Sequence, residues 1–265
     1  MFRPVLPLAG LPGWNLLNRT LDTQRAAFDA APETVRDTDY FEARIGTVKT
    51  AEDLVADRRL LRVALGAFGL QEDIDSRFLI RKVLEGGTDN PDALANRLSD
   101  DRYRQLSAAF GFGDDAAGPR TSEAGFGAGI TARFRARSFE VAVGEQDQSL
   151  RLAMNAARDL ADLGADDATD DTRWFRILGT LPLRDVFETA FGLPDGVGQL
   201  DLDRQLDIFK QAAREKLGIE SLDAFTEAGA RDRLIETFLL RDQLKAGGSL
   251  SPQAIALTLL QAGRG

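Results

Sequence analysis

The acidic residues best placed for chemistry stand in adjacent pairs, at Asp114–Asp115, Asp166–Asp167 and Asp170–Asp171. Carboxylate oxygens are the ligands that Ca²⁺ and Mg²⁺ prefer in proteins, so each pair is a candidate cation site. A calcium loop of the EF-hand type needs alternating acidic residues, a central glycine and a final glutamate, and none of the pairs has this order. Adjacent aspartates more often form turns and cap helices, so we predict no metal site at these positions.

Two glycine-rich stretches resemble loops that hold phosphate groups, namely GFGDDAAG at 111–118 and GFGAG at 125–129. A phosphate loop needs a preceding apolar strand and a following helix, so that backbone N–H groups and the helix dipole face the anion. No strand pattern precedes either stretch, and no lysine follows the glycines as in a Walker loop. We therefore interpret Gly111–Gly129 as a flexible connection.

Histidine and cysteine are both missing from the 265 residues. Their absence excludes disulfide bonds, zinc sites with thiolate or histidine ligands, iron–sulfur clusters, serine triads and cysteine nucleophiles. An enzyme built from this sequence would depend on carboxylates, lysine or tyrosine, and no spaced acidic motif supports one. We therefore predict no enzyme and no cofactor, and we keep a carboxylate-based, Mg²⁺-dependent enzyme as an alternative.

The net charge of −9 argues against nonspecific binding to nucleic acid or to anionic membranes, because both need an excess of Lys and Arg. Arg58, Arg59 and Arg62 nevertheless form a local basic group. Asp53 and Asp57 precede this group closely enough to pair with it along one helix. We interpret the group as a solvated charged face and predict no nucleic-acid partner.

The amino-terminal stretch MFRPVLPLAGLPGWNLL is apolar but is interrupted by prolines and glycines. A secretory signal has an unbroken apolar core, and a membrane-spanning helix needs about 20 consecutive apolar residues. Neither pattern occurs in the sequence. We therefore expect a cytoplasmic protein with no segment inserted in a membrane.

Helical spacing of apolar residues predicts helices over almost the whole chain, joined by short loops. Thr50 and Asp53 resemble a capping box at a helix start. Gly69 stands where a helix ends in the left-handed conformation, and Gly66 before it indicates a close helix crossing. The segment Arg133–Val143 also suits a strand, and we interpret it as a helix because no partner strand is nearby. The predicted fold class is therefore all-α, a multi-helical array.

Two parts of the sequence are similar to each other. Residues Ile177–Leu193 align with Leu54–Leu70 without a gap, and the order of the predicted elements matches as well. We predict that the array consists of two diverged copies of a unit of three to four helices, whereas chance similarity between helices of like periodicity is the alternative. The same four residue types recur at the two joints of this repeat, namely Ala67, Phe68, Gly69, Leu70, Ala190, Phe191, Gly192 and Leu193.

The repeat predicts four segments. Residues 1–112 form an N-terminal arm and the first repeat, followed by a Gly-rich linker or loop over 113–129. Residues 130–245 form linking helices and the second repeat, and 246–265 form a C-terminal tail helix. The second copy has diverged, because Glu188 stands where the first copy has Leu65.

Several motifs occur in an order that one protein family shares. They are Tyr40-Phe41, LLRVALGAFGL at 60–70, KVLEGG at 82–87, NRLSDDRYRQLSAAFGF at 96–112, GEQDQSLRLAMNAARDL at 144–160 and FETAFGLPDGVGQLDLDRQL at 187–206. Over roughly residues 14–245 the sequence resembles the alphaproteobacterial family of domains of unknown function numbered 1217. The resemblance implies a helical bacterial protein without established activity, associated with the flagellum because several members are encoded near flagellar genes. It transfers no catalytic residue.

From the residues and the resemblance together we expect a non-catalytic structural and interaction protein that presents helix grooves to protein partners, which include flagellar components. A small-ligand binding module with a pocket between the repeats is a further alternative. The apolar arm and the tail helix supply the candidate partner contacts, namely Trp14, Leu16, Leu17, Ile255 and Leu259. The alternative for the arm is that it packs on the helices of its own chain. The sequence does not determine the oligomeric state.

Overall fold

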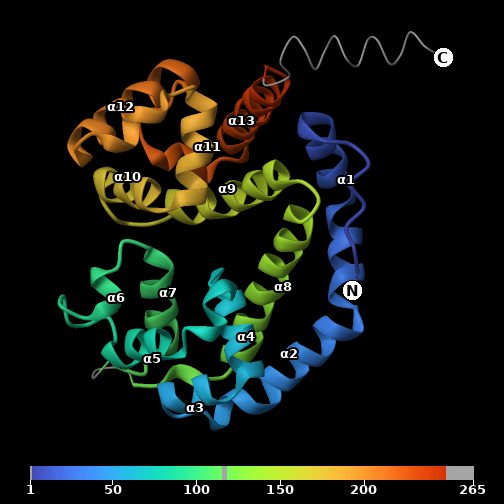
Figure 1. Cartoon of the computed structure of the whole chain (residues 1–265), viewed down its shortest axis with the longest axis vertical. Helices are drawn as coiled ribbons and strands as arrows, with labels where there is room; N and C mark the ends of the chain where they lie inside the picture. Colours follow the sequence, from blue (N-terminus) through green and yellow to red (C-terminus); the bar gives the residue numbers. More distant parts are fainter. Residues whose placement is uncertain (1, 115–117, 249–265) are drawn as a thin grey trace. The chain divides into compact units, whose positions relative to one another are not determined.

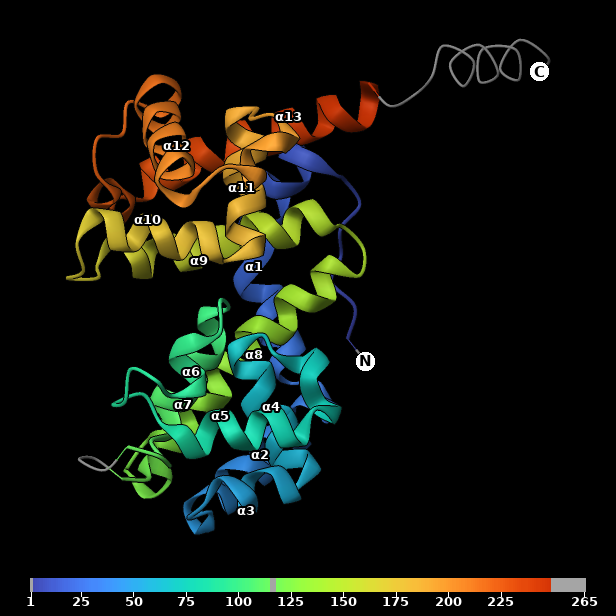
Figure 2. The same ribbon diagram turned by 60° about the vertical axis from the view of Figure 1, so that its left-hand side comes forward.

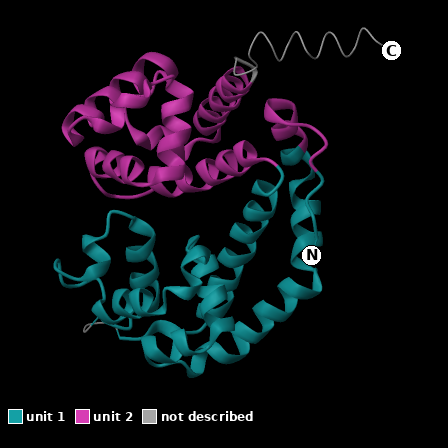
Figure 3. Cartoon of the chain, in the orientation of Figure 1, with its two compact units in different colours: residues 1–5, 17–146 teal, residues 6–16, 147–265 magenta. Residues whose placement is uncertain are grey.

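The computed structural model describes residues 2–114 and 118–248. This part of the chain contains thirteen α-helices and five short 3-10 helices and no strand (Figure 1). The predicted all-α fold class is therefore confirmed. The chain divides into two compact units, unit 1 with residues 1–5 and 17–146 and unit 2 with residues 6–16 and 147–265 (Figure 3).

Unit 1 holds the first eight α-helices, of which α1 (Gly10–Asp29) gives its initial residues to unit 2. The others follow in chain order, namely α2 (Pro32–Arg44), η1 (Ile45–Thr47), α3 (Ala51–Ala56), α4 (Arg58–Phe68), η2 (Gln71–Asp75), α5 (Arg77–Gly86), α6 (Leu94–Arg97), α7 (Asp101–Phe110), η3 (Arg120–Ser122) and α8 (Phe126–Gly144). Helix α3 begins with the predicted capping box, in which Thr50 Oγ1 accepts from the N–H of Asp53 at 3.1 Å and Asp53 Oδ2 accepts from the N–H of Thr50 at 3.0 Å.

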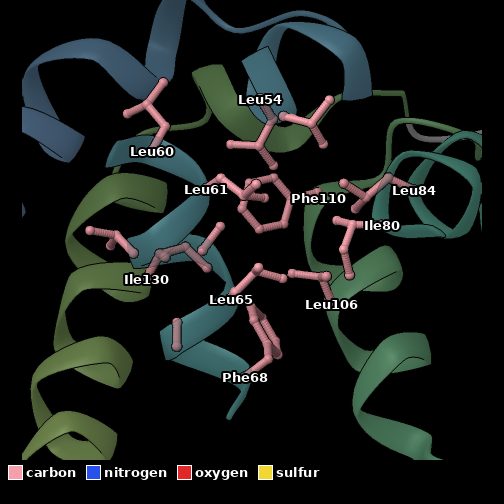
Figure 4. Packing of buried hydrophobic residues seen from close by; sticks show 14 of the residues in the cluster. Leu54, Leu60, Leu61, Leu65, Phe68, Ile80, Leu84, Leu106, Phe110 and Ile130 are labelled. Carbon is pink, nitrogen blue, oxygen red and sulfur yellow. The ribbon is translucent and has the colours of Figure 1, made fainter. Parts of the chain in front are cut away.

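The core of unit 1 is built around α4. This helix starts at Asp57, whose carboxylate accepts from the N–H groups of Arg59 and Leu60, and almost every residue after its first turn is buried. Figure 4 shows Leu61 and Leu65 facing Phe110 and Leu106 of α7. One face of α4 carries the exposed Arg58, Arg59 and Arg62, and the rest of its surface is apolar and packs against α2, α3, α7 and α8.

Helix α8 crosses α4 at Gly66, where the sequence predicts a close helix crossing. A Cβ on Gly66 would lie 2.7 Å from Cδ2 of Phe134, a distance that real Cβ atoms do not show. The missing side chain therefore lets the Phe134 ring contact the backbone of α4 directly. The segment Arg133–Val143, which also suited a strand, is helical as predicted and lies within α8.

Unit 2 holds the remaining helices (Figure 2). They are α9 (Gln148–Gly164), α10 (Asp170–Gly179), α11 (Leu181–Phe191), η4 (Asp195–Gln199), α12 (Leu202–Leu217), η5 (Leu222–Thr226) and α13 (Ala228–Gly248). The core of unit 2 contains a cluster of aromatic rings centred on Phe187. The Phe187 ring lies edge-on to the rings of Trp174, Phe191 and Phe225, at centroid distances of 5.5, 5.4 and 6.0 Å. Helix α11 carries this ring and packs against α9, α10 and α13.

The glycine-rich linker predicted over 113–129 is shorter than expected. Residues Phe126–Gly129 form the first turn of α8, and η3 lies within the predicted linker as well. Helix α8 begins before residue 130, where the predicted linker ends. Phe126 packs edge-on against Phe110 with a centroid distance of 5.2 Å, and Gly127 brings the backbone of α8 close to Ile45 of η1. The two compact units divide after residue 146, beyond α8, and not at the glycine-rich stretch.

Candidate functional site

The first predicted joint lies at the end of α4, where Gly69 has a φ of 74°. The N–H of Leu70 donates to the carbonyl oxygen of Leu65 at 2.9 Å, which closes the helix end as in a Schellman motif. The guanidinium of Arg102 donates to the carbonyl oxygen of Gly69. This position requires glycine for its conformation, because L side chains rarely adopt a φ of 74°.

The second predicted joint has the same backbone structure at the end of α11. Gly192 has a φ of 63°, and the N–H of Leu193 donates to the carbonyl oxygen of Glu188 at 2.9 Å. Four further joint residues are buried, namely Ala67, Phe68, Ala190 and Phe191. The joints therefore position helices, and their side chains offer no group that reacts or that binds a ligand.

Asp114, Asp166, Asp170 and Asp171, four members of the acidic pairs, form structural contacts. Asp114 Oδ1 accepts from the N–H of Thr88 at 2.6 Å. Asp166 pairs with Arg176 at 2.6 Å, and the hydrogen bond from Arg176 holds the pKa of Asp166 below its usual range. Asp170 accepts from the N–H of Leu222 at 2.8 Å, and Asp171 pairs with Lys210. Over 2–114 and 118–248 no group of three acidic side chains is arranged to hold a metal ion, and Asp115 lies outside the described residues.

The local basic group pairs differently from the expectation. Arg59 and Arg62 lie 3.6 and 3.4 Å from the carboxylate of Asp37 on α2, and Arg58 pairs with Asp75 of η2 at 2.6 Å. The predicted pairing with Asp53 and Asp57 is wrong, because those two carboxylates cap the starts of α3 and α4. Arg58, Arg59 and Arg62 are all exposed, so they form the solvated charged face that the sequence predicts, and their ion pairs tie α4 to α2 and η2.

The candidate partner contacts differ in how far they are buried. Trp14 and Leu17 are buried, with exposed fractions of 6% and 1%, whereas Leu16 is half-buried. Burial of Trp14 and Leu17 agrees with the alternative in which the arm packs on its own chain. Ile255 and Leu259 lie outside the described residues.

Unit 2 carries exposed apolar side chains that the sequence analysis did not identify. Leu240 and Leu244 stand one helical turn apart on α13, with exposed fractions of 49% and 74%. Leu181 at the start of α11 is 78% exposed. We call these residues, together with Phe175, Leu200 and Leu202, the exposed apolar set of unit 2. A sequence signal existed, because three consecutive apolar residues at 238–240 cannot all face the core of one helix.

Unit 1 contains a groove of about 450 Å³ between α1, α2 and α8. Its charged lining consists of Arg25 and Asp29 of α1, Glu42 of α2 and Arg135 of α8. Thr131 Oγ1 donates to Oε1 of Glu42 at 2.5 Å across the groove. Sequence reasoning missed this cluster, because its members are far apart along the chain and only the packing of three helices brings them together.

Every helix in the described part of the chain is too short or too polar to span a membrane. The profile of one family, described as "Protein of unknown function (DUF1217)", matches residues 67–227. The fold is similar to the crystal structure of Protein AGR_C_984 from Agrobacterium tumefaciens, with a TM-score of 0.74, 23% sequence identity, and coverage of 92% of this chain and 99% of that chain. At this identity the similarity concerns the fold alone. No curated protein matches the chain.

Proposed function

This chain belongs to the DUF1217 family of proteins of unknown function, and we propose that it is a non-catalytic structural and interaction protein. We further propose that its partners are flagellar components and that it takes part in flagellar assembly or function. The flagellar part of the proposal comes from the alphaproteobacterial family resemblance of the sequence. The interaction part comes from the exposed apolar set of unit 2.

The exposed leucine pair on α13 is the observation that carries the proposal. Leu240 and Leu244 share one face of the helix, while Leu239 beside them is fully buried. Burial of one leucine side chain contributes roughly 1.5–3 kcal/mol relative to exposure, so a partner that covers both gains a substantial part of a binding free energy. Two exposed leucines on one helix face form an apolar surface that a partner can cover.

The charged residues of unit 2 also support a structural role. Arg173 is 4% exposed and donates to Asp223 at 2.6 Å and to the carbonyl oxygen of Gly164 at 3.3 Å. Asp170 completes the group at 3.6 Å. The hydrogen bond from Arg173 lowers the pKa of Asp223, so this carboxyl stays ionised as an ion-pair partner. The cluster ties α9, α10 and η5 together.

Quantitative affinity capture from cells tests the proposal. The wild-type chain is expected to recover flagellar proteins, and the double variant Leu240→Lys, Leu244→Lys is expected to lose them while keeping the wild-type melting temperature. Lysine preserves helix propensity, and both positions are exposed, so the fold is retained. The matched control is Phe78→Lys on α5, a residue 69% exposed in unit 1, which should recover the same proteins as wild type. Undiminished recovery with the double variant, or recovery without any flagellar protein, contradicts the proposal.

A further inference from the structure

The groove in unit 1 is lined by two arginines, Arg25 and Arg135. Among the described residues neither Arg25 nor Arg135 forms an ion pair. Arg135 Nη2 donates to Oγ1 of Thr38 at 2.8 Å, and the Cζ of Arg25 lies 6.0 Å from the centroid of the Phe139 ring. The Nε–H groups of both arginines are buried and have no acceptor. A buried donor without an acceptor costs free energy, so a ligand that brings a hydrogen-bond acceptor into the groove would be stabilised there.

Two other arginines in the described structure have buried nitrogen atoms without an acceptor, but both form ion pairs. Arg173 Nε and Arg184 Nη2 also lack a hydrogen-bond acceptor. Their charges are nevertheless compensated, because Arg173 pairs with Asp223 at 2.6 Å and Arg184 pairs with Glu188 at 2.7 Å. Only in the groove do two partly buried guanidinium groups, each with an unsatisfied Nε–H, line one hollow without a paired carboxylate in the described structure.

The carboxylates of the groove are unpaired as well. Among the described residues, the carboxylate of Glu42 accepts only the hydroxyl of Thr131, and the carboxylate of Asp29 has no hydrogen bond or ion pair. The same hollow therefore presents two cations and two anions that do not reach one another. In a compact protein such groups usually collapse into pairs, because the pairing is favourable at short range in a partly desolvated site.

The floor of the groove keeps these charges apart. Ala128, Ala132 and Ala136 recur every four residues along α8, so they share one helix face and leave room above it. The resulting volume of about 450 Å³ lies within the range of small-molecule sites. A ligand seated here contacts short side chains below and charged side chains around it.

We propose that this groove binds a small zwitterion, whose carboxylate lies between Arg25 and Arg135 and whose cationic group lies toward Asp29 and Glu42. A dianion satisfies the arginines but is repelled by the two carboxylates. A diamine satisfies the carboxylates but is repelled by the arginines. A molecule that carries both charges a few bonds apart, such as an amino acid or an ω-amino acid, matches both halves of the lining.

Isothermal titration calorimetry on the full chain tests this inference. The probes are γ-aminobutyrate, L-lysine and glycine as zwitterions, succinate and inorganic phosphate as anions, and putrescine as a dication. We expect at least one zwitterion to bind with a millimolar or lower Kd and more tightly than every anion and than putrescine. The inference is overturned if no zwitterion binds at about 10 mM, or if phosphate, succinate or putrescine binds most tightly.

Variants locate the site. Arg25→Gln and Arg135→Gln should each weaken zwitterion binding about tenfold or more, because each removes a charge-assisted hydrogen bond. Arg135→Lys keeps the charge but lacks Nε–H, and it should recover only part of the affinity. Arg19→Gln is the matched control, since Arg19 is an exposed residue of the same helix as Arg25 and lies outside the groove.

A second kind of variant separates binding from folding. Ala132→Leu adds volume to the floor at an exposed helical position, where leucine keeps helix propensity. We expect it to abolish zwitterion binding while the melting temperature without ligand stays at the wild-type value. An unchanged Kd in Ala132→Leu, or in both glutamine variants, would place the binding elsewhere and overturn the inference.

Discussion

Helices α4 and α11 have the same ending and different surroundings. Both have eleven residues, both stop at a glycine in the left-handed conformation, and both close with a 2.9 Å hydrogen bond from the residue after that glycine. Among the aligned positions that differ, one has opposite character, because Leu65 is fully buried whereas Glu188 is half-buried and paired with Arg184. The end of each helix therefore depends on the left-handed backbone conformation of its glycine. Which residues of the helix are buried depends on the side chains of the neighbouring helices.

The elements around the two helices also correspond. Helix α3 packs against α4 and α5, and α10 packs against α11 and α12 in the same order along the chain. Aligned core positions are buried in both, namely Leu60 and Leu183, Val63 and Val186, and Phe68 and Phe191. These features agree with the predicted duplication, which stays a prediction. Substitutions at aligned positions of α4 and α11 measure whether the two helices contribute to stability in the same way.

The largest expected effect comes from exchanging the aligned residues Leu65 and Glu188. Leu65→Glu places a carboxylate without a partner in the core of unit 1, and we expect a loss of about 4 kcal/mol or more in the free energy of unfolding. Glu188→Leu removes a partly exposed ion pair, and its effect should stay within about 1 kcal/mol. Urea unfolding followed by circular dichroism measures both. Equal losses would mean that α4 and α11 have equivalent environments.

The next effect concerns the close crossing of α4 and α8. Gly66 aligns with Thr189 of α11, so Gly66→Thr converts the first copy to the second at this site. The added atoms meet the Phe134 ring, and overpacking of this kind costs about 3 kcal/mol. Gly129→Thr on α8 is the control, because a Cβ at Gly129 meets no atom within 4 Å. If both variants unfold at the same urea concentration, the crossing does not depend on the glycine.

A smaller effect is expected at the joints themselves. Gly69→Val and Gly192→Val each force a β-branched residue into the left-handed conformation, which costs about 2 kcal/mol. Both variants should lower the thermal melting temperature of the protein by similar amounts. A melting temperature untouched by either change would show that the glycine is not needed at that helix end.

The smallest loss of stability is expected from substitutions at the N-caps of α4 and α11. Asp57 caps α4 by accepting from the N–H groups of Arg59 and Leu60, whereas the aligned Thr180 makes no side-chain cap for α11. Asp57→Ala should therefore cost about 1 kcal/mol, and Thr180→Ala should be close to neutral. Urea midpoints compare the two. A larger loss at Thr180 than at Asp57 would reverse the difference that the structure shows.

Local signals in the sequence predicted the local structure well. The capping box at Thr50 and the left-handed Gly69 each depend on a few neighbouring residues, and both are present. The ambiguous segment Arg133–Val143 was assigned correctly because the lack of a partner strand was itself informative. Even the close crossing at Gly66 was signalled, since glycine inside a helix needs a reason.

Signals that depend on distant residues were missed. The partner of Arg59 is Asp37 on another helix, and no spacing rule connects them. The groove joins Arg25, Glu42 and Arg135, which only the packing of α1, α2 and α8 brings together. The early start of α8 follows from the contact between Phe126 and Phe110, which no local pattern encodes.

Swimming of a clean deletion strain tests the central claim most directly, namely that the chain is an interaction protein of the flagellum. We expect the deletion to abolish or reduce swimming and filament assembly. The wild-type gene and the Phe78→Lys control should restore both, and the double variant Leu240→Lys, Leu244→Lys should not. Normal filaments and normal swimming speed in the deletion strain would contradict the account.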